Sequence, residues 1–314
     1  MTTPVMETSP SQKPLRLTPP AKINLHLRVG PPTADGFHPL MSWMVTAALF
    51  DNLEFTLIDR PGVSLLCDDP TIPCDAKNLI VKTASSLLES IASPDKSKRA
   101  VRGLSAALQK RIPVGAGLGG GSSDGAFALL AVNHLFNLNW PPDRLSDFAA
   151  QFGSDLSFFF HGPSSICTGR GQIVHPTAPP KASWALLILP AIHMPTPAVY
   201  RRFDEMRLGQ ESSLNHPPDW QNWSTLSAND LLPLLINDLE APAFSVNASL
   251  ADLHQSTSQV LNRIVRMSGS GSTLFTLYDS QDQAVHAASL IQNHLQTRAI
   301  AVELCPPLKL PPQS

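Results

Sequence analysis

The sequence has no large excess of charge of either sign. Its 314 residues include 23 Lys and Arg against 25 Asp and Glu, for a formal net charge of −2. A protein that binds nucleic acid through the phosphate backbone usually shows a basic stripe, so this balance argues against a nucleic-acid partner. Charged residues make up 15% of the chain and hydrophobic residues 43%, which is enough apolar material for the cores of two domains.

The chain also lacks an apolar run long enough to cross a membrane. Its longest run, near WALLILPAI, falls short of the ~18 residues that a span requires. The opening stretch MTTPVMETSPSQKPL has no apolar segment of the kind found in a secretory leader. We therefore expect a cytoplasmic protein with no membrane partner, and a disordered, proline-rich tail over residues 1–15.

Cysteine is scarce, and none of the four cysteines forms a C-x-x-C pair or has a histidine nearby at zinc-ligand spacing. They are Cys67, Cys74, Cys167 and Cys305. We expect reduced thiols rather than a disulfide framework or a zinc site.

Glycine, by contrast, is concentrated in one place. Six of the seventeen glycines lie between residues 115 and 125, within RIPVGAGLGGGSSDGAF, and a long apolar pattern follows. Glycine lets a ligand approach the main chain, and a helix start offers unpaired N–H groups with a partial positive charge. The stretch therefore predicts a phosphate cradle. A tight turn with an ordinary N-cap would explain only one Gly and one Ser.

Two familiar phosphate loops can be set aside. GAGLGG satisfies G-x-G-x-x-G, but Lys110, Arg111 and Pro113 stand where a dinucleotide site needs an apolar strand. A Walker A loop needs a lysine directly after its glycines, and none follows Gly121.

Asp124 poses a problem, because it lies where phosphate charge would accumulate. Either its carboxylate points away or a Mg²⁺ ion lies between. A serine hydroxyl together with triphosphate oxygens is a normal Mg²⁺ environment. We therefore predict Ser122 as a metal ligand.

Helix and strand patterns mix without a regular β-α-β rhythm, which favours an α+β fold. Residues 21–29 alternate with period two and predict a half-buried strand with Lys22 and Asn24 on its polar face. The polar stretch 209–230 is expected to be loop. PTAPPKAS is expected to link a unit of residues 16–178 to a second unit of residues 179–314. Further helices are predicted within 78–91, 125–138, 143–153 and 282–296, and further strands within 184–191, 269–278 and 299–304.

The glycine loop resembles the second motif of the GHMP kinases, the superfamily of galactokinase, homoserine, mevalonate and phosphomevalonate kinases. Its pattern is P-x-x-x-G-L-G-G-G-S-S before a buried helix. Other stretches of the sequence match the family pattern in the same order: PAKINLHL, ADGFHPL, GSDLSFFFHGPSSICTGRGQ, PTPAVY, NDLE and MSGSGSTLF. The resemblance therefore covers about residues 16 to 306. AKINL, DGFH and GLGGGSS together are similar to the branch that phosphorylates a cytidine-diphospho sugar alcohol.

The resemblance implies a two-domain α+β kinase whose active site lies in the cleft between the domains, with ATP and Mg²⁺ as cofactors. The γ-phosphoryl group would pass to the 2-hydroxyl of a methylerythritol unit, in the non-mevalonate route to isoprenoids. The small-molecule substrate is the implied partner, and both a monomer and a homodimer stay open. ATP would contact the whole loop: Pro113, Val114, Gly115, Ala116, Gly117, Leu118, Gly119, Gly120, Gly121, Ser122 and Ser123.

The resemblance makes Lys22 and Asp155 the catalytic pair. Phosphoryl transfer needs alignment and charge neutralisation, and a carboxylate can accept the proton of the attacking hydroxyl. A nearby cation would keep Asp155 ionised and offset developing negative charge. Lys22 and Asn24 leave the same strand face roughly 6.6 Å apart, so one can reach the reacting oxygens while the other anchors substrate. Whether Asp155 removes the proton or only orients the hydroxyl stays open.

The resemblance assigns five residues to the cytidine and sugar-alcohol end: Asn24, Phe37, His38, Thr196 and Tyr200. Phe37 and Tyr200 lie in expected loops and are candidates for stacking on a base, which is worth about 1–3 kcal/mol. His38 can offer a donor and an acceptor to a cytosine edge. Arg170, in an expected turn, is assigned no role.

Two departures from the family pattern stand out. Leu156-Ser157 follows Asp155 where the family usually has Val-Pro, and Phe37 stands where many members have Tyr. Two other functions are weighed: another small-molecule GHMP kinase of the homoserine or mevalonate type, and a nucleotide-binding sensor without catalysis. The DGFH loop argues against the first, and the presence of Lys22 and Asp155 argues against the second.

Overall fold

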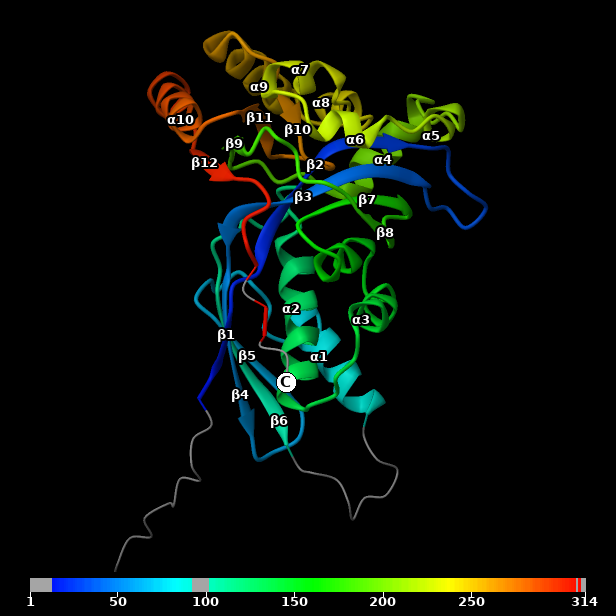
Figure 1. Cartoon of the computed structure of the whole chain (residues 1–314), viewed down its shortest axis with the longest axis vertical. Helices are drawn as coiled ribbons and strands as arrows, with labels where there is room; N and C mark the ends of the chain where they lie inside the picture. Colours follow the sequence, from blue (N-terminus) through cyan, green and yellow to red (C-terminus); the bar gives the residue numbers. More distant parts are fainter. Residues whose placement is uncertain (1–12, 92–101, 309, 312–314) are drawn as a thin grey trace, which may run out of the picture.

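The computed structural model describes residues 13–91, 102–308 and 310–311. Three four-stranded sheets and the helices beside them form an α+β fold (Figure 1). The expected disordered tail lies mostly outside the described residues, but its limit at residue 15 is wrong. Leu15 is already in a strand, where it pairs with Phe55.

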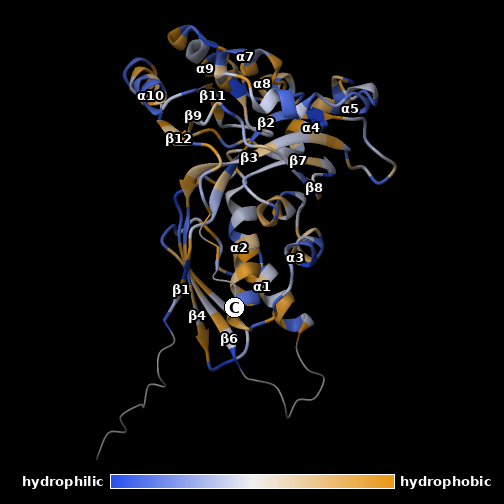
Figure 2. Ribbon diagram, in the orientation of Figure 1, coloured by the Kyte–Doolittle hydropathy of each residue, from blue (hydrophilic) through white to orange (hydrophobic). Residues whose placement is uncertain are grey.

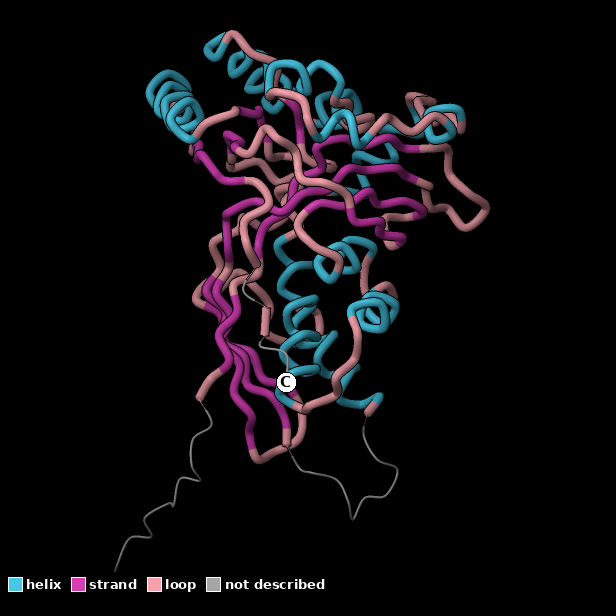
Figure 3. The backbone as a smooth tube through the Cα atoms, viewed as in Figure 1, coloured by secondary structure: helices cyan, strands magenta, loops and turns pink. Residues whose placement is uncertain are grey.

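The first sheet has the order β1-β4-β6-β5, and β5 runs parallel to β6 while the other pairs are antiparallel. Its strands are β1 (Leu15–Leu17), β4 (Asn52–Ile58), β5 (Val63–Cys67) and β6 (Gly103–Gln109). A layer of helices lies beside it, as Figure 3 shows. They are α1 (Leu79–Ser90), α2 (Gly120–Leu135) and α3 (Pro142–Ala149). Apolar residues run along α2 (Figure 2), which is buried as its sequence predicts.

The second sheet has the order β2-β3-β7-β8 and is antiparallel throughout. Its strands are β2 (Pro20–Val29), β3 (Leu40–Phe50), β7 (Ser164–Gly169) and β8 (Ile173–Pro176). The prediction that residues 21–29 are half-buried with one polar face is wrong, because Lys22, Asn24 and His26 are all buried. The pairing of β2 with β3 is irregular between Asn24 and His26, so Asn24 lies opposite Met44 and His26 opposite Trp43, on different faces of the sheet. Both faces of β2 are covered, and the strand lies in the interior.

The third sheet belongs to the C-terminal half and has the order β10-β11-β9-β12. Its strands are β9 (Trp184–Ile188), β10 (Arg266–Met267), β11 (Leu274–Tyr278) and β12 (Ala299–Glu303). The longer helices of this half are α4 (Thr196–Glu205), α8 (Glu240–Val246), α9 (Ala248–Leu261) and α10 (Gln281–Leu295).

The stretch 209–230 is not the loop that its polarity predicts. It contains α5 (Ser212–Asn215), α6 (Trp220–Ser224) and most of α7 (Ala228–Leu231). The Asp219 side chain accepts from the Asn222 N–H and caps α6, while the rings of Trp220 and Trp223 pack edge-on against His26. This contact with a residue about 200 positions away cannot be seen in the local polarity.

The expected boundary at residue 178 falls in the segment between β8 and β9. One hydrophobic cluster draws residues from both sides of it, including Ile23 and Val45 together with Leu187 and Phe275. The division into units 16–178 and 179–314 therefore stays a prediction. Within the described ranges, no helix is long and apolar enough to cross a membrane.

Candidate active site

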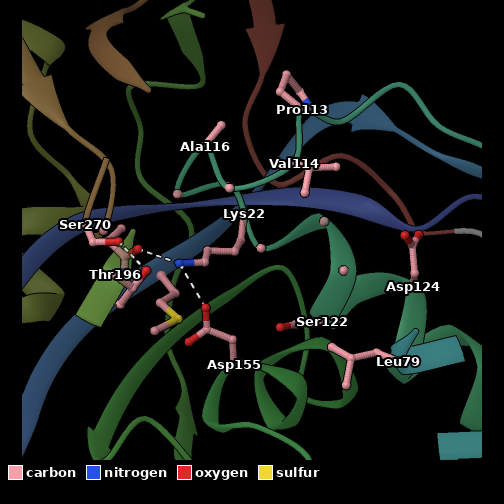
Figure 4. Close-up of a pocket in the computed structure, with 18 of the residues that line it drawn as sticks. Lys22, Leu79, Pro113, Val114, Ala116, Ser122, Asp124, Asp155, Thr196 and Ser270 are labelled. Carbon is pink, nitrogen blue, oxygen red and sulfur yellow. Dashed lines mark hydrogen bonds and ion pairs between the residues drawn. The ribbon is translucent and has the colours of Figure 1, made fainter. Parts of the chain in front are cut away.

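A cavity of about 480 Å³ lies between the glycine loop, the start of α1, strand β2 and helix α4. Figure 4 shows that side chains from distant parts of the sequence converge on it. Lys22 comes from β2 and Asp155 from the 3-10 helix η2 (Ser154–Phe160), while Thr196 begins α4. The cavity therefore joins the two halves of the chain.

The glycine loop has the geometry of an anion cradle. Gly115, Gly117 and Gly119 all have left-handed backbones, with φ of +67°, +76° and +66°. A Cβ on Gly117 would lie 2.2 Å from the carbonyl oxygen of Ser268, so only glycine fits there. Helix α2 begins at Gly120, and no side chain caps it. Its first N–H groups are left for a ligand, as phosphate binding requires.

Helix α2 begins earlier than the predicted range 125–138. Ser122, Ser123 and Asp124 therefore lie inside its first turns. Ser122 lines the cavity, whereas Leu118 and Ser123 are fully buried and do not. Of the predicted ATP contacts, the structure places these along the cavity: Pro113, Val114, Gly115, Ala116, Gly117, Gly119, Gly120, Gly121 and Ser122.

Asp124 points away from the phosphate position, toward a buried lysine. The Nζ of Lys110 lies 2.7 Å from Asp124 Oδ2 and 2.5 Å from Asp51 Oδ2. Asp51 also accepts the N–H groups of Arg111 and Ile112, and so fixes the approach to the glycine loop. Burial raises the pKa of Asp124 to about 7, and the nearby Lys110 ammonium opposes that shift. Burial acts to lower the pKa of Lys110, but the carboxylates of Asp124 and Asp51 together outweigh it and raise that pKa.

The structure brings the predicted catalytic pair together. Lys22 Nζ lies 3.1 Å from Asp155 Oδ2, with the lysine side chain 5% exposed and that of the aspartate 34%. Lys22 Nζ also donates to Asn24 Oδ1 at 2.6 Å, and Asn24 Nδ2 donates to Ser42 Oγ. The ammonium is thus held in place, while the carboxylate stays open to the cavity (Figure 4).

Thr196 and Tyr200 line the opposite part of the cavity, but not from a loop. The prediction that Tyr200 lies in a loop is wrong, because both residues belong to α4. The Thr196 Oγ1 and Ser270 Oγ atoms are 2.8 Å apart. Burial, followed by the nearby Asp155 carboxylate, raises the pKa of Tyr200 to about 12, so its phenol stays protonated.

Phe37 and His38 do not line the cavity, although His38 packs against Tyr200, which does. The His38 ring is 5.1 Å from that of Tyr200, its Nδ1 is 2.9 Å from Gly30 O, and its Nε2 is 3.4 Å from Asp204. Phe37 is 53% exposed. Both ring nitrogens of His38 therefore already have protein neighbours.

Arg170, to which the sequence assigns no role, contacts this loop. Its guanidinium lies 3.9 Å from the centre of the Phe37 ring and forms an ion pair with Asp35. The turn that carries Arg170 thus lies against the residue predicted to stack on a base.

Sequence reasoning missed the far wall of the cavity. Ile72, Pro73 and Leu79 form an apolar end next to the start of α1, and the polar residues Lys77 and Asn78 line the cavity beside them. An Asn before an apolar helix is a recognisable N-cap, and Asn78 Oδ1 does accept from the Ile80 N–H. Nothing in that local pattern indicates that this helix end faces a ligand site.

The four cysteines are free, as predicted. In the part of the chain that the structure describes, no group of three or more His, Cys, Asp or Glu side chains could hold a metal ion. A Mg²⁺ ion bound through Ser122 and phosphate oxygens needs no such group, because Mg²⁺ commonly keeps water and substrate oxygens as ligands.

Comparison with known proteins points in one direction. Residues 78–163 match the model of the GHMP kinases N terminal domain. A 4-diphosphocytidyl-2-C-methyl-D-erythritol kinase of Synechococcus sp. (strain CC9902) is 35% identical over 305 residues, covering 93% of this chain and 96% of the relative. Its counterpart from Prochlorococcus marinus (strain MIT 9313) is 38% identical over 295 residues, covering 90% of each chain.

Solved structures agree. A crystal structure of 4-(cytidine 5'-diphospho)-2C-methyl-D-erythritol kinase superposes with a TM-score of 0.73 at 31% identity, covering 93% of this chain and all of the other. A homoserine kinase from Cytophaga hutchinsonii superposes with a TM-score of 0.69 at 16% identity, covering 96% of each chain. The second likeness shows a shared fold alone.

Proposed function

The chain belongs to the 4-diphosphocytidyl-2-C-methyl-D-erythritol kinases of the GHMP superfamily, and we propose that Lys22 and Asp155 are the residues that carry its reaction. The protein is an ATP-dependent small-molecule kinase that phosphorylates the 2-hydroxyl of 4-diphosphocytidyl-2-C-methyl-D-erythritol. The observation that carries the proposal on the pair is the 3.1 Å contact between Lys22 and Asp155, on a cavity that the glycine loop also lines.

The nucleotide would lie along the glycine loop. Its phosphates fit the uncapped start of α2, where N–H groups and the helix dipole favour negative charge. The apolar end formed by Pro73 and Leu79 suits a nucleoside base. Ser122 would hold Mg²⁺, which would supply charge neutralisation between phosphate oxygens. Asp124 does not oppose this arrangement, because its carboxylate faces the Lys110 ammonium rather than the phosphate position.

The acceptor alcohol would lie between Asp155 and the phosphates. Its hydroxyl oxygen forms the new bond to the γ-phosphorus as the bond from that phosphorus to the bridging oxygen of ADP breaks. Asp155 orients the hydroxyl and can accept its proton. Lys22 lies against the Asp155 carboxylate and offsets the negative charge that develops on the transferred group. Positioning and charge neutralisation are the main requirements of phosphoryl transfer.

The cytidine end of the substrate would lie near α4. Tyr200 and Thr196 already line that part of the cavity, and Asn24 lies next to Lys22. Phe37 would stack on the base with the ring face that Arg170 leaves free. His38 would read the cytosine edge after exchanging one of its present neighbours. A monomer or homodimer and a cytoplasmic location stay predictions.

The identity of the substrate can be tested by supplying ATP to the purified protein and measuring ADP release with three acceptors in turn. We expect turnover with 4-diphosphocytidyl-2-C-methyl-D-erythritol and little with homoserine or mevalonate. A reaction without acceptor measures background hydrolysis. Faster turnover with homoserine or mevalonate would favour another GHMP kinase. ATP binding without turnover on any acceptor would favour the nucleotide sensor.

A further inference from the structure

A second glycine-containing turn, residues 268–272, packs directly against the glycine loop. It joins β10 to β11, and Asn237 holds it from behind by donating from Nδ2 to Met267 O and Gly269 O at 2.7 and 2.8 Å. Ser268 lies between these two carbonyls in the sequence and is fully buried. Nothing in the proposed reaction uses its side chain.

The Ser268 hydroxyl makes two hydrogen bonds to different parts of the site. It donates to the carbonyl oxygen of Gly117 at 2.9 Å, and it accepts from the backbone N–H of Asn24 at 3.2 Å. One oxygen atom thus connects the glycine loop to the strand that carries Lys22 and Asn24.

This bond is one of three that hold successive residues of the loop. Thr273 N donates to Ala116 O at 3.1 Å, and Lys22 N donates to Leu118 O at 2.8 Å. Ser268 holds the carbonyl between them. Only the Ser268 bond comes from a side chain, so it is the one that a substitution can remove.

Fixing a carbonyl also fixes the next N–H group, because the two point in opposite directions in a trans peptide. The bond from Ser268 to Gly117 therefore sets the direction of the Leu118 N–H. That N–H lies between Gly117 and Gly119, which line the cavity, in the loop proposed to bind phosphate through backbone donors.

We propose that Ser268 is a positioning residue that holds the glycine loop in register with β2, so that the phosphates and the Lys22–Asp155 pair are aligned before substrate binds. This inference rests on the proposed function, since it assumes that the loop binds the nucleotide. It predicts that the hydroxyl matters for ATP affinity and turnover beyond its effect on stability.

Ser272→Ala is the matched control. Ser272 lies in the same turn and is equally buried, but its hydroxyl donates to Ile192 O at 2.5 Å and does not touch the glycine loop. Ser268→Ala removes two buried hydrogen bonds and Ser272→Ala removes one, so we expect both variants to lose stability in urea unfolding, Ser268→Ala by up to about twice as much. Only Ser268→Ala should weaken ATP binding, about tenfold by titration calorimetry without acceptor, and lower kcat about tenfold. The KM for the acceptor should change less than twofold in either variant.

An ATP Kd of Ser268→Ala within twofold of wild type, or an equal change in Ser272→Ala, would overturn the proposal. Ser268→Cys keeps most of the side-chain volume but makes only a weak hydrogen bond. If the alanine variant does not fold, the cysteine variant should weaken ATP binding in the same direction, and wild-type affinity there would overturn it. ATP binding needs no acceptor, so failure of wild type to phosphorylate the cytidyl compound would count against the proposed function and leave the test of Ser268 intact.

Discussion

The part of the site at Lys22 is enclosed, whereas Phe37, at the predicted substrate end, is open to solvent. Lys22 is nearly buried and has two polar partners, and Asp51 and Lys110 brace the chain just before the loop. Phe37 is half exposed, and its described ring partner is the exposed guanidinium of Arg170. The end at which we propose that bonds change is thus held by several protein contacts, whereas Phe37, proposed to stack on the substrate, is exposed.

The largest effect should come from the enclosed end. Asp155→Asn keeps the size of the side chain but removes the charge and the ability to accept a proton. We expect kcat to fall by about 10³-fold with little change in melting temperature or substrate KM. Steady-state ADP release and a thermal melt measure these quantities. If the variant kept its activity, Asp155 would have no part in the mechanism. The distinction between an enclosed catalytic end and an open substrate end would then also fail.

Gly117→Ala tests the enclosed geometry itself. The new Cβ meets the Ser268 carbonyl oxygen at 2.2 Å and forces a left-handed backbone on alanine, so the loop must shift. We expect ATP affinity to fall at least tenfold, measured by titration calorimetry. Gly62→Ala is the control, because Gly62 also has a left-handed backbone, with φ of +97°, but its Cβ would meet nothing within 4 Å. An ATP affinity of Gly117→Ala as high as that of Gly62→Ala would contradict the importance of the close approach at Gly117.

At the open end, Phe37→Ala should act on substrate binding rather than on chemistry. Loss of one stacking face should raise the KM for 4-diphosphocytidyl-2-C-methyl-D-erythritol about tenfold and leave kcat within twofold. Phe37→Tyr keeps the ring and should behave like wild type. An unchanged KM in the alanine variant would contradict stacking, and a large drop in kcat would show that the two ends are not separable.

The smallest effect is a pH dependence confined to the enclosed end. Burial raises the pKa of Asp124 from its ordinary 3.8 to about 7, so the folded protein binds this proton more tightly than the unfolded chain. Stability from this group is therefore lost as pH rises toward and through about 7. Asp124→Asn should lose less stability than wild type between pH 5 and pH 8, as measured by urea unfolding.

A parallel pH dependence in wild type and Asp124→Asn would contradict this assignment. Burial also lowers the pKa of His26 to about 3, which makes stability rise with pH over part of the same range. That contribution is common to both proteins and cancels in the comparison.

The sequence predicts the chemistry of the site better than its surroundings. The glycine loop and the strand of Lys22 follow from short-range rules, since positive φ, helix starts and period-two alternation are local properties. The catalytic pair, 133 residues apart, was assigned from the family resemblance, and the structure places its members 3.1 Å apart. Their roles remain predictions.

The features that the sequence could not predict, the burial of β2 and the helices within 209–230, depend on contacts with distant segments. Strand β2 is buried on both faces because Trp220 and Trp223 cover His26 and Ser268 covers Asn24. Period-two alternation reports only which face is apolar. The helices within 209–230 have the same cause, because their tryptophans are fixed by tertiary contacts that outweigh local polarity.

The hydrophobic cluster shared by β2, β3, β9 and β11 determines what happens when the chain is divided into fragments. A break at residue 178 would leave each fragment with a bare apolar wall, one lined by Ile23 and Val45 and the other by Leu187 and Phe275. Either half expressed without the other would therefore expose to water the apolar surface that the two halves bury against each other.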